Sequence, residues 1–195
     1  MFFNEPFGGL IPGARGAVLS VLLKTGTPLT GRQVHRLVGV YSLWSVQEAL
    51  KVLTHLGLVE TTSVGRASLY TLNPDHYAIQ SLSAVADPIA ALRTVVSQTV
   101  DDHVTSVILF GSIARGESTE SSDIDLAVMT VGDWSGRTDL QKAVSNRLGT
   151  PCDVVVFTES EFTHLAEVGE PVVNDILRDG VVLYGRKPQM GESGK

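Results

Sequence analysis

The sequence has few of the features that mark secreted and membrane proteins. Its single cysteine, Cys152, rules out an intrachain disulfide. No apolar run approaches the roughly 18 residues that a membrane-spanning helix needs. The first residues lack the positive charge with which a signal peptide begins. The five histidines show no metal-ligand spacing. We therefore expect a cytoplasmic protein without a membrane segment.

Positive charge is also scarce, and it is unevenly distributed. The chain carries 15 Lys and Arg against 21 Asp and Glu, a formal net charge of −6. Residues 1–76 hold six of the basic and four of the acidic residues, so this part is mildly basic and the remainder strongly acidic. Such asymmetry indicates two domains with different tasks. A surplus of two positive charges is only weak support for nucleic-acid binding, because phosphate contacts normally recruit several cations.

The first part of the chain has the pattern of three helices followed by a hairpin. Apolar residues recur at helical spacing over 14–24 and again after Tyr41, and Thr30 is placed to cap a helix over 31–38. Gly57 is expected to end the third helix. Two extended runs, 58–62 and 67–72, flank a short turn. A helical linker over 76–87 then leads into a second domain.

Strands and helices alternate after the linker, which predicts an α/β domain over 88–185. The polar residues 186–195 are expected to form a disordered tail. The expected elements are a helix over 88–101, a strand over 106–110, a helical opening at 112–115, a strand over 124–129, a helix over 138–148, a strand over 153–157, one helix over 159–177 and a strand over 181–184.

The most informative stretch joins a phosphate-binding pattern to a pair of carboxylates. An apolar strand runs into Gly111 and Ser112 at the start of a helix, where free N–H groups and a hydroxyl can contact a phosphate. Asp123 and Asp125 are two residues apart on a strand, so their side chains share a face. Their mutual repulsion makes sense if divalent cations lie between them. If the strand that Asp153 opens lies alongside, three carboxylates converge, which suits two-metal phosphoryl chemistry.

The stretch from Gly111 to Leu126 resembles the nucleotidyltransferase superfamily of DNA polymerase beta, and its minimal nucleotidyltransferase branch more closely. The branch motif, Gly-Ser-x-Ala-Arg-Gly-Glu, a short spacer and Ser-Asp-Ile-Asp-Leu, is matched residue for residue. The resemblance covers residues 88–185. It implies an α+β fold, with a mixed sheet and flanking helices, that uses ATP or another nucleoside triphosphate together with two Mg²⁺ ions.

The resemblance also implies roles for individual residues. Asp153 would complete the metal site and assist the acceptor hydroxyl, but it could instead cap the start of its strand. Arg115 would support a phosphate or the loop, and a surface salt bridge is an equal alternative. The roles are nucleotide contact for Gly111, Ser112 and Arg115, and metal binding with catalysis for Asp123, Asp125 and Asp153.

The three helices and hairpin of the first part resemble the winged helix-turn-helix of bacterial regulators. This implies a small N-terminal DNA-binding domain over residues 1–75, in which the third helix lies in the major groove. Glu48 on that helix is unfavourable near phosphate, and winged helices also serve as dimer or protein-docking modules. The residues expected to contact double-stranded DNA are Arg32, Ser45, Gln47, Lys51 and Arg66.

Two functions from different classes follow. The first is transfer of a nucleoside monophosphate, AMP foremost, to a hydroxyl of a partner protein. The branch that the chain resembles includes antitoxins that modify a HEPN-type ribonuclease toxin, and a winged-helix homodimer would then regulate transcription of the operon. The second is a regulator whose nucleotidyltransferase fold senses nucleotide without transfer. An antibiotic-modifying enzyme or a DNA polymerase fits less well, since the first normally brings a helical substrate domain and the acidic second domain would repel a template.

Overall fold

The chain forms two compact units. The computed structural model describes residues 3, 7, 10–119 and 121–188. One unit comprises Asn4–Pro88, and the other comprises Ile89–Lys195 together with Phe3. Among the described residues, no helix is long and apolar enough to cross a membrane.

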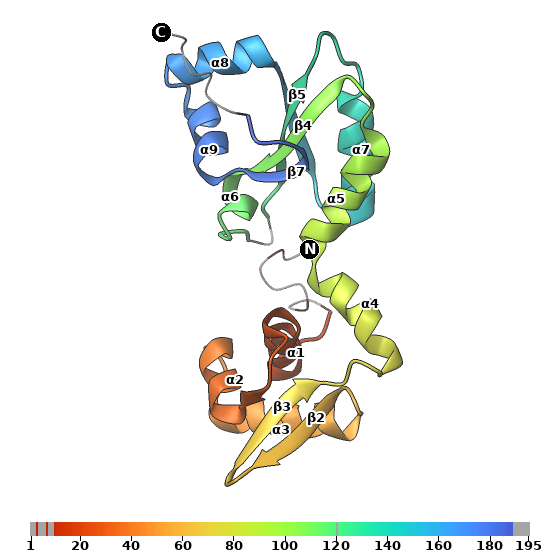
Figure 1. The fold of residues 1–195 in the computed structure, drawn as a ribbon, viewed down its shortest axis with the longest axis vertical. Helices are drawn as coiled ribbons and strands as arrows, with labels where there is room; N and C mark the ends of the chain where they lie inside the picture. Colours follow the sequence, from red (N-terminus) through yellow and green to blue (C-terminus); the bar gives the residue numbers. More distant parts are fainter. Residues whose placement is uncertain (1–2, 4–6, 8–9, 120, 189–195) are drawn as a thin grey trace. The chain divides into compact units, whose positions relative to one another are not determined.

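The Asn4–Pro88 unit packs helices against a small antiparallel sheet with the strand order β1-β3-β2 (Figure 1). Its helices are α1 (Ala14–Thr25), α2 (Gly31–Val38), α3 (Leu43–His55) and α4 (Tyr77–Ala86), and its strands are β1 (Leu29–Thr30), β2 (Val59–Val64) and β3 (Ala67–Leu72). The three helices and the hairpin lie where the periodicity predicts them, except that β2 continues to Val64, two residues beyond the predicted strand. The two-residue strand β1 is an addition that no pattern indicated. The predicted linker over 76–87 is largely the helix α4.

Local capping chemistry fixes the ends of these helices. The Thr30 hydroxyl accepts the N–H of Gln33, and the Gln33 side chain accepts the N–H of Thr30, a reciprocal capping box. Ser42 caps α3 by accepting the N–H of Ser45 at 3.1 Å. Gly57 follows α3 with φ +75°, a conformation that favours glycine. These caps confirm the helix boundaries expected at Thr30 and Gly57.

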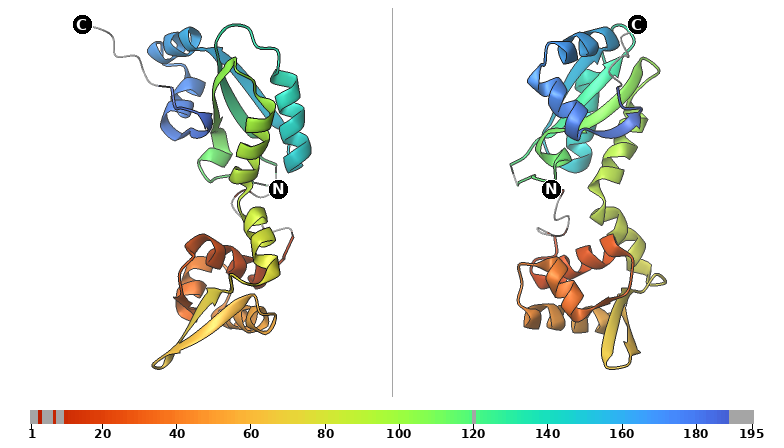
Figure 2. Two further views of the ribbon diagram at one scale, coloured as in Figure 1. Left: turned by 45° about the vertical axis from the view of Figure 1, so that its right-hand side comes forward. Right: turned by 60° about the vertical axis from the view of Figure 1, so that its left-hand side comes forward.

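The Ile89–Lys195 unit is a four-stranded mixed sheet with helices on both faces (Figures 1 and 2). The strands lie in the order β6-β5-β4-β7; β5 and β6 are parallel, while β4 pairs antiparallel with both β5 and β7. The helix α7 connects β5 to β6, as a parallel pair requires. The elements are α5 (Pro88–Thr99), β4 (Val104–Phe110), α6 (Gly111–Ala114), β5 (Ile124–Thr130), α7 (Arg137–Leu148), β6 (Cys152–Thr158), α8 (Glu159–Glu167), α9 (Pro171–Asp179) and β7 (Val181–Gly185).

The two faces of this sheet carry separate cores. α5 and α7 cover the face that presents Leu109, Leu126 and Val154. α8 and α9 cover the opposite face, which presents Ile108 and Ala127. Because side chains alternate along a strand, Asp125 and Asp153 belong to the face covered by α8 and α9.

The single helix predicted over 159–177 is wrong, because the segment forms α8 and α9 with a break between them. Gly169 has φ +75°, which ends the helical path, and Pro171 occupies the first turn of α9, where its missing N–H costs nothing. The predicted disordered tail over 186–195 falls mostly on residues 189–195, which lie outside the described residues.

Candidate active site

Asp125 and Asp153 are cross-strand neighbours. They are register partners in the parallel pair β5–β6, so both carboxylates leave the sheet on the same face. Adjacent strands lie about 4.8 Å apart, which brings the two acidic groups close together. Like charges directly opposite one another destabilise a sheet, so the juxtaposition has a cost in the absence of a counter-ion.

Asp125 is the most perturbed carboxylate of the group. Its pKa is raised above the ordinary value of 3.8, first by burial and then by the negative charges of Asp153 and Asp123; the nearby Arg115 opposes the rise. The half-buried position and the like charges therefore act together. Because the interaction between charges weakens with distance, these effects indicate that the three aspartates and Arg115 lie close together.

Asp123 differs from its predicted placement on a strand. It lies one residue before β5 and is exposed, whereas Asp125 is half-buried within β5. The preceding turn is held by Ser122, whose hydroxyl accepts the N–H of Thr119 at 2.8 Å. The N–H of Ile124, directly after Asp123, donates to the carbonyl of Pro151 at 2.9 Å, which fixes the start of β5 against the start of β6.

Gly111 is held against Asp125. Phe110, the last residue of β4, pairs with Asp125, and the chain then turns into α6 with Gly111 at φ +74°. A Cβ on residue 111 would overlap the Oδ2 atom of Asp125. Both the backbone conformation and the missing side chain are therefore required for β4 and β5 to present this end to a ligand. Ser112 follows in α6, a single turn that begins one residue before the predicted helical opening at 112–115 and has the same length.

Arg115 ends α6 and makes a salt bridge. Its Nε lies 2.8 Å from Oε2 of Glu117, and its side chain is about one-third exposed. The pKa of Arg115 is raised, chiefly by the hydrogen bond with Glu117 and in part by Asp175 and Asp179. The salt-bridge alternative of the sequence analysis is thus present, while Arg115 also acts on Asp125 through its charge.

The acidic group has the chemistry of a divalent-cation site without being a preformed cage. Among the described side chains, no three His, Cys, Asp or Glu residues are already arranged to hold a metal. The donor set nevertheless fits Mg²⁺, a hard cation that takes carboxylate oxygens and keeps several waters. The observation that supports the fit is the register pairing of Asp125 with Asp153, together with the raised pKa of Asp125, which is caused first by burial and then by the negative charges of Asp153 and Asp123. These three residues would hold the ion.

One polar contact beside this group has no counterpart in the sequence analysis. The side-chain amide of Gln141, on α7, donates from Nε2 to the carbonyl oxygen of Cys152 at 3.1 Å, one residue before Asp153. The helical periodicity of α7 places Leu140 and Val144 in the core and only indicates that Gln141 lies at the flank. No spacing rule links residue 141 to residue 152.

The candidate DNA contacts of α3 are only partly available. Gln47 is exposed. Lys51 is exposed but paired with Glu48 at 2.6 Å, which raises the pKa of Lys51. The hydroxyl of Ser45 lies 2.9 Å from that of Ser42, so it takes part in the cap of α3. Of the three residues on this helix, Gln47 alone is exposed without a hydrogen-bond partner among the described residues.

Two further candidate DNA contacts, Arg32 and Arg66, lie on either side of α3 in the sequence. Arg32 and Arg36 on α2 line a shallow hollow with His35, Gly39 and Leu43. Arg66 is exposed in the turn that joins β2 to β3, at the tip of the hairpin. The exposed charges of Arg32 and Arg66 thus lie on separate elements on either side of α3 in the sequence.

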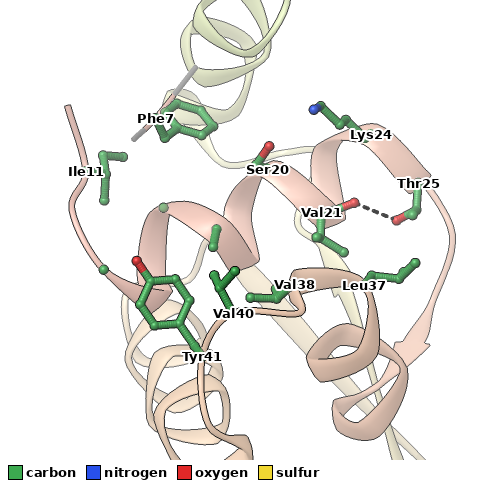
Figure 3. Close-up of a pocket in the computed structure, with 13 residues that line it drawn as sticks. Phe7, Ile11, Ser20, Val21, Lys24, Thr25, Leu37, Val38, Val40 and Tyr41 are labelled. Carbon is green, nitrogen blue, oxygen red and sulfur yellow. Dashed lines mark hydrogen bonds between the residues drawn. The ribbon is translucent and has the colours of Figure 1, made fainter. Parts of the chain in front are cut away.

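The same unit has a second hollow, of about 370 Å³, between α1 and the turn that joins α2 to α3 (Figure 3). Val38 at the end of α2, Val40 and Tyr41 of the following turn, and Val21 of α1 are among the residues that line it. The Thr25 hydroxyl at its rim is engaged, since it donates to the carbonyl of Val21 at 2.9 Å. None of the candidate DNA contacts lines this hollow.

Comparisons with known proteins concern the second unit. Residues 94–189 match the family model described as polymerase beta, nucleotidyltransferase. A protein of Methanocaldococcus jannaschii named "putative protein adenylyltransferase" is 32% identical over 81 residues, which are 42% of this chain and 79% of that protein.

Two solved structures are similar at low sequence identity. A chain in the crystal structure of a toxin–antitoxin with AMP-PNP is 20% identical with a TM-score of 0.40, and the match covers 51% of this chain and 74% of that one. A chain in the structure of a tri-AMPylated Shewanella oneidensis HEPN toxin in complex with MNT antitoxin is 19% identical with a TM-score of 0.35, over 50% and 73% of the two chains.

Proposed function

This chain belongs to the polymerase beta nucleotidyltransferase family and is a nucleotidyltransferase, and from that premise we propose that it transfers AMP from ATP to a hydroxyl of a partner protein. The observation that carries the proposal is the pairing of Asp125 with Asp153 across β5 and β6, with the backbone of Gly111 directly beside Asp125. Carboxylates gathered at the end of a sheet, beside a backbone free of side chain, suit the binding of a metal-bound triphosphate.

The reaction is a substitution at the α-phosphorus. The acceptor oxygen forms a bond to that phosphorus, the bond to the bridging oxygen of the β-phosphate breaks, and pyrophosphate leaves. A bound Mg²⁺ would neutralise charge on the triphosphate and would lower the pKa of the attacking hydroxyl. Asp123, Asp125 and Asp153 would hold the ion, and Asp153, the more exposed of the register pair, would also orient the acceptor hydroxyl and take its proton.

The side chains around the carboxylates favour an anionic ligand with bound cations over a bare anion. Gly111 lets a phosphate approach the backbone beside Asp125, and Ser112 adds a hydroxyl. Arg115 is held by Glu117 in this structure, so contact with a phosphate requires exchange of that partner. We assign Gly111, Ser112 and Arg115 to the nucleotide and the three aspartates to the metal.

A protein acceptor is supported by the Methanocaldococcus jannaschii relative, whose name is that of a protein adenylyltransferase. The motif resemblance to minimal nucleotidyltransferases extends the proposal to a HEPN-type toxin as the acceptor. The open position of Asp153 and Asp123 at the surface is consistent with a macromolecular acceptor, because a hydroxyl on a partner protein must reach them from outside.

We further propose that the first unit binds double-stranded DNA as a winged helix. The proposal is supported by its element order, which is a helix, a short strand, two helices and a hairpin, and by its sheet order β1-β3-β2. α3 would enter the major groove with Gln47 and Lys51, and Arg66 at the hairpin tip would reach the backbone or minor groove. A palindromic operator would then call for a homodimer.

A regulator that binds nucleotide without transfer is the second candidate. The observation that favours it is the lack of a preformed three-ligand cluster among the described side chains. In that case nucleotide binding would alter DNA affinity, and no label would reach a protein.

The deciding experiment is transfer from ATP labelled at the α-phosphate, in Mg²⁺, to the protein encoded beside this one. Wild type is compared with the Asp123→Ala, Asp125→Ala double variant and with Asp133→Ala, an exposed aspartate of the loop after β5. We expect label on the partner with wild type and Asp133→Ala and none with the double variant. Label that persists in the double variant would remove the metal assignment. ATP binding without any label would favour the second candidate.

A further inference from the structure

The start of β6 must be held in place, because the carboxylates of Asp153 and Asp125 repel each other. Asp153 is the second residue of β6, and its carboxylate is exposed at the end of the sheet. Toward β5 it is held by the strand pairing and by the carbonyl of Pro151, which accepts the N–H of Ile124 at 2.9 Å. A strand end held from one side only can move away from a like charge.

The second restraint comes from the other side of β6. In a parallel ladder, the backbone groups of successive residues point to alternate sides of the strand. Since the carbonyl of Pro151 faces β5, the carbonyl of Cys152 faces away from it. That carbonyl accepts the Nε2 hydrogen of Gln141 at 3.1 Å. The peptide that leads into Asp153 is thus held between β5 and α7.

The surroundings make this hydrogen bond more than a surface contact. Gln141 is half-buried, and Cys152 is only 7% exposed, with its side chain in the core. A buried carbonyl that loses its donor regains a partner only if the backbone shifts or water enters. Either change would move the peptide that directly precedes Asp153.

We propose that Gln141 is a positioning residue, which acts through the Cys152 carbonyl to hold the Asp153 carboxylate where a divalent cation can bind it together with Asp125 and Asp123. The inference rests on the proposed function in one respect, the assignment of these aspartates to a metal. Gln141 touches neither metal nor substrate in this role. Its effect is to keep an otherwise repulsive arrangement ready for the ion.

The test is direct titration of the full chain with Mn²⁺, read by the electron paramagnetic resonance of the free ion, without ATP or acceptor. Gln141→Leu removes the donor, and Gln141→Met removes it while keeping the length of the side chain. The matched control is Asn146→Leu, which replaces an exposed amide on the same helix. Circular dichroism confirms that each variant is folded.

We expect both Gln141 variants to bind Mn²⁺ about three- to tenfold more weakly than wild type, the range expected when one hydrogen bond is removed. Asn146→Leu should bind like wild type. In transfer assays, the Mg²⁺ concentration for half-maximal rate should rise in the Gln141 variants, while the rate at saturating Mg²⁺ stays close to that of wild type, because excess cation restores the arrangement. A purely structural role would lower the saturated rate through loss of folded protein.

Unchanged Mn²⁺ affinity in a folded Gln141→Leu or Gln141→Met protein overturns the inference. Equal weakening in Asn146→Leu also overturns it, since the effect would then belong to α7 in general. A wild type that binds no Mn²⁺ removes the metal premise and this inference with it. A wild type that binds Mn²⁺ but labels no protein removes the proposed acceptor and leaves the role of Gln141 to be decided by the affinities.

Discussion

Gly111 lies so close to Asp125 that a Cβ at position 111 would overlap the Oδ2 atom of the carboxylate, so any other residue there would force the Asp125 side chain to move. A Gly111→Ala variant would bring a methyl group against Oδ2 of Asp125, in addition to a left-handed backbone that costs a non-glycine residue about 1–2 kcal/mol. We expect a loss of transfer of about 100-fold, the effect of displacing a reacting group by roughly 1 Å. Gly132→Ala is the matched control, because Gly132 has φ +76° and an open space where a Cβ would stand. Urea denaturation would measure the loss of stability that both variants share because alanine takes a positive φ. Transfer rates would show the additional effect of the contact with Asp125, which only Gly111→Ala makes. Similar transfer rates in the two variants would contradict the close approach.

Asp125 should weaken the fold at neutral pH when no divalent cation is present. Its pKa is raised in the folded chain, so the carboxyl favours the folded state while protonated, and this contribution is lost as the pH rises through the raised pKa. Asp125→Asn should therefore be more stable than wild type at pH 7 in EDTA. The difference should vanish below the ordinary pKa of 3.8, where the carboxyl is protonated in both states. Denaturant melts at pH 7 and pH 3 measure this, with Asp133→Asn as the exposed control. If wild type were more stable than Asp125→Asn at pH 7, the ionised Asp125 would stabilise the fold, and the prediction would be wrong.

Cys152 should be unreactive in the native protein. Burial, followed by the charges of Asp153, Asp125 and Asp123, raises the pKa of its thiol to about 12. The thiolate is the nucleophile, so almost none is present at pH 8. Mass spectrometry after treatment with iodoacetamide should show labelling only in urea. Rapid modification of the folded chain would place Cys152 outside the core.

DNA affinity should depend on the pairing of Lys51 with Glu48. Because Glu48 lies 2.6 Å from Lys51 and competes for its charge, Glu48→Gln should strengthen DNA binding. Lys51→Ala and Arg66→Ala should each weaken it and reduce the slope of log affinity against log salt by about 0.9 for every phosphate that the variant no longer neutralises. Fluorescence anisotropy with the upstream DNA of the gene, at several salt concentrations, measures both quantities. Lys142→Ala, an exposed lysine of the second unit, is the control. A flat response to all of these changes would indicate that the first unit is a docking module.

Much of the fold, and the three aspartates of the acidic group, could be predicted from local sequence patterns. Thr30 and Gly57 marked helix ends because capping depends on a few adjacent residues. The motif brought Asp123 and Asp125 to attention, while the pairing of Asp125 with Asp153 depended on β5 and β6 being neighbours, which the sequence analysis could only state as a condition. The structure supplies that condition as a parallel register.

The features that escaped the sequence analysis are tertiary or depend on competing local signals. Gln141 reaches Cys152 only because α7 packs beside β6, and no periodicity encodes that approach. The break between α8 and α9 was missed because apolar spacing continues through the segment while Gly169 and Pro171 interrupt the backbone. The salt bridge between Lys51 and Glu48 was also missed, because a spacing of three residues on a helix allows such a pair but does not require it.

The parallel pairing of β5 with β6 also determines when the three aspartates come together during synthesis of the chain. A hairpin would gather its acidic residues within a few positions, but here the whole of α7 separates Asp125 from Asp153. The last strand, β7, then pairs with β4 and completes the sheet. Contacts of such long sequence separation form slowly and late. A chain still emerging from the ribosome therefore carries Asp123 and Asp125 without Asp153, so the proposed metal site is complete only after β6 has paired with β5.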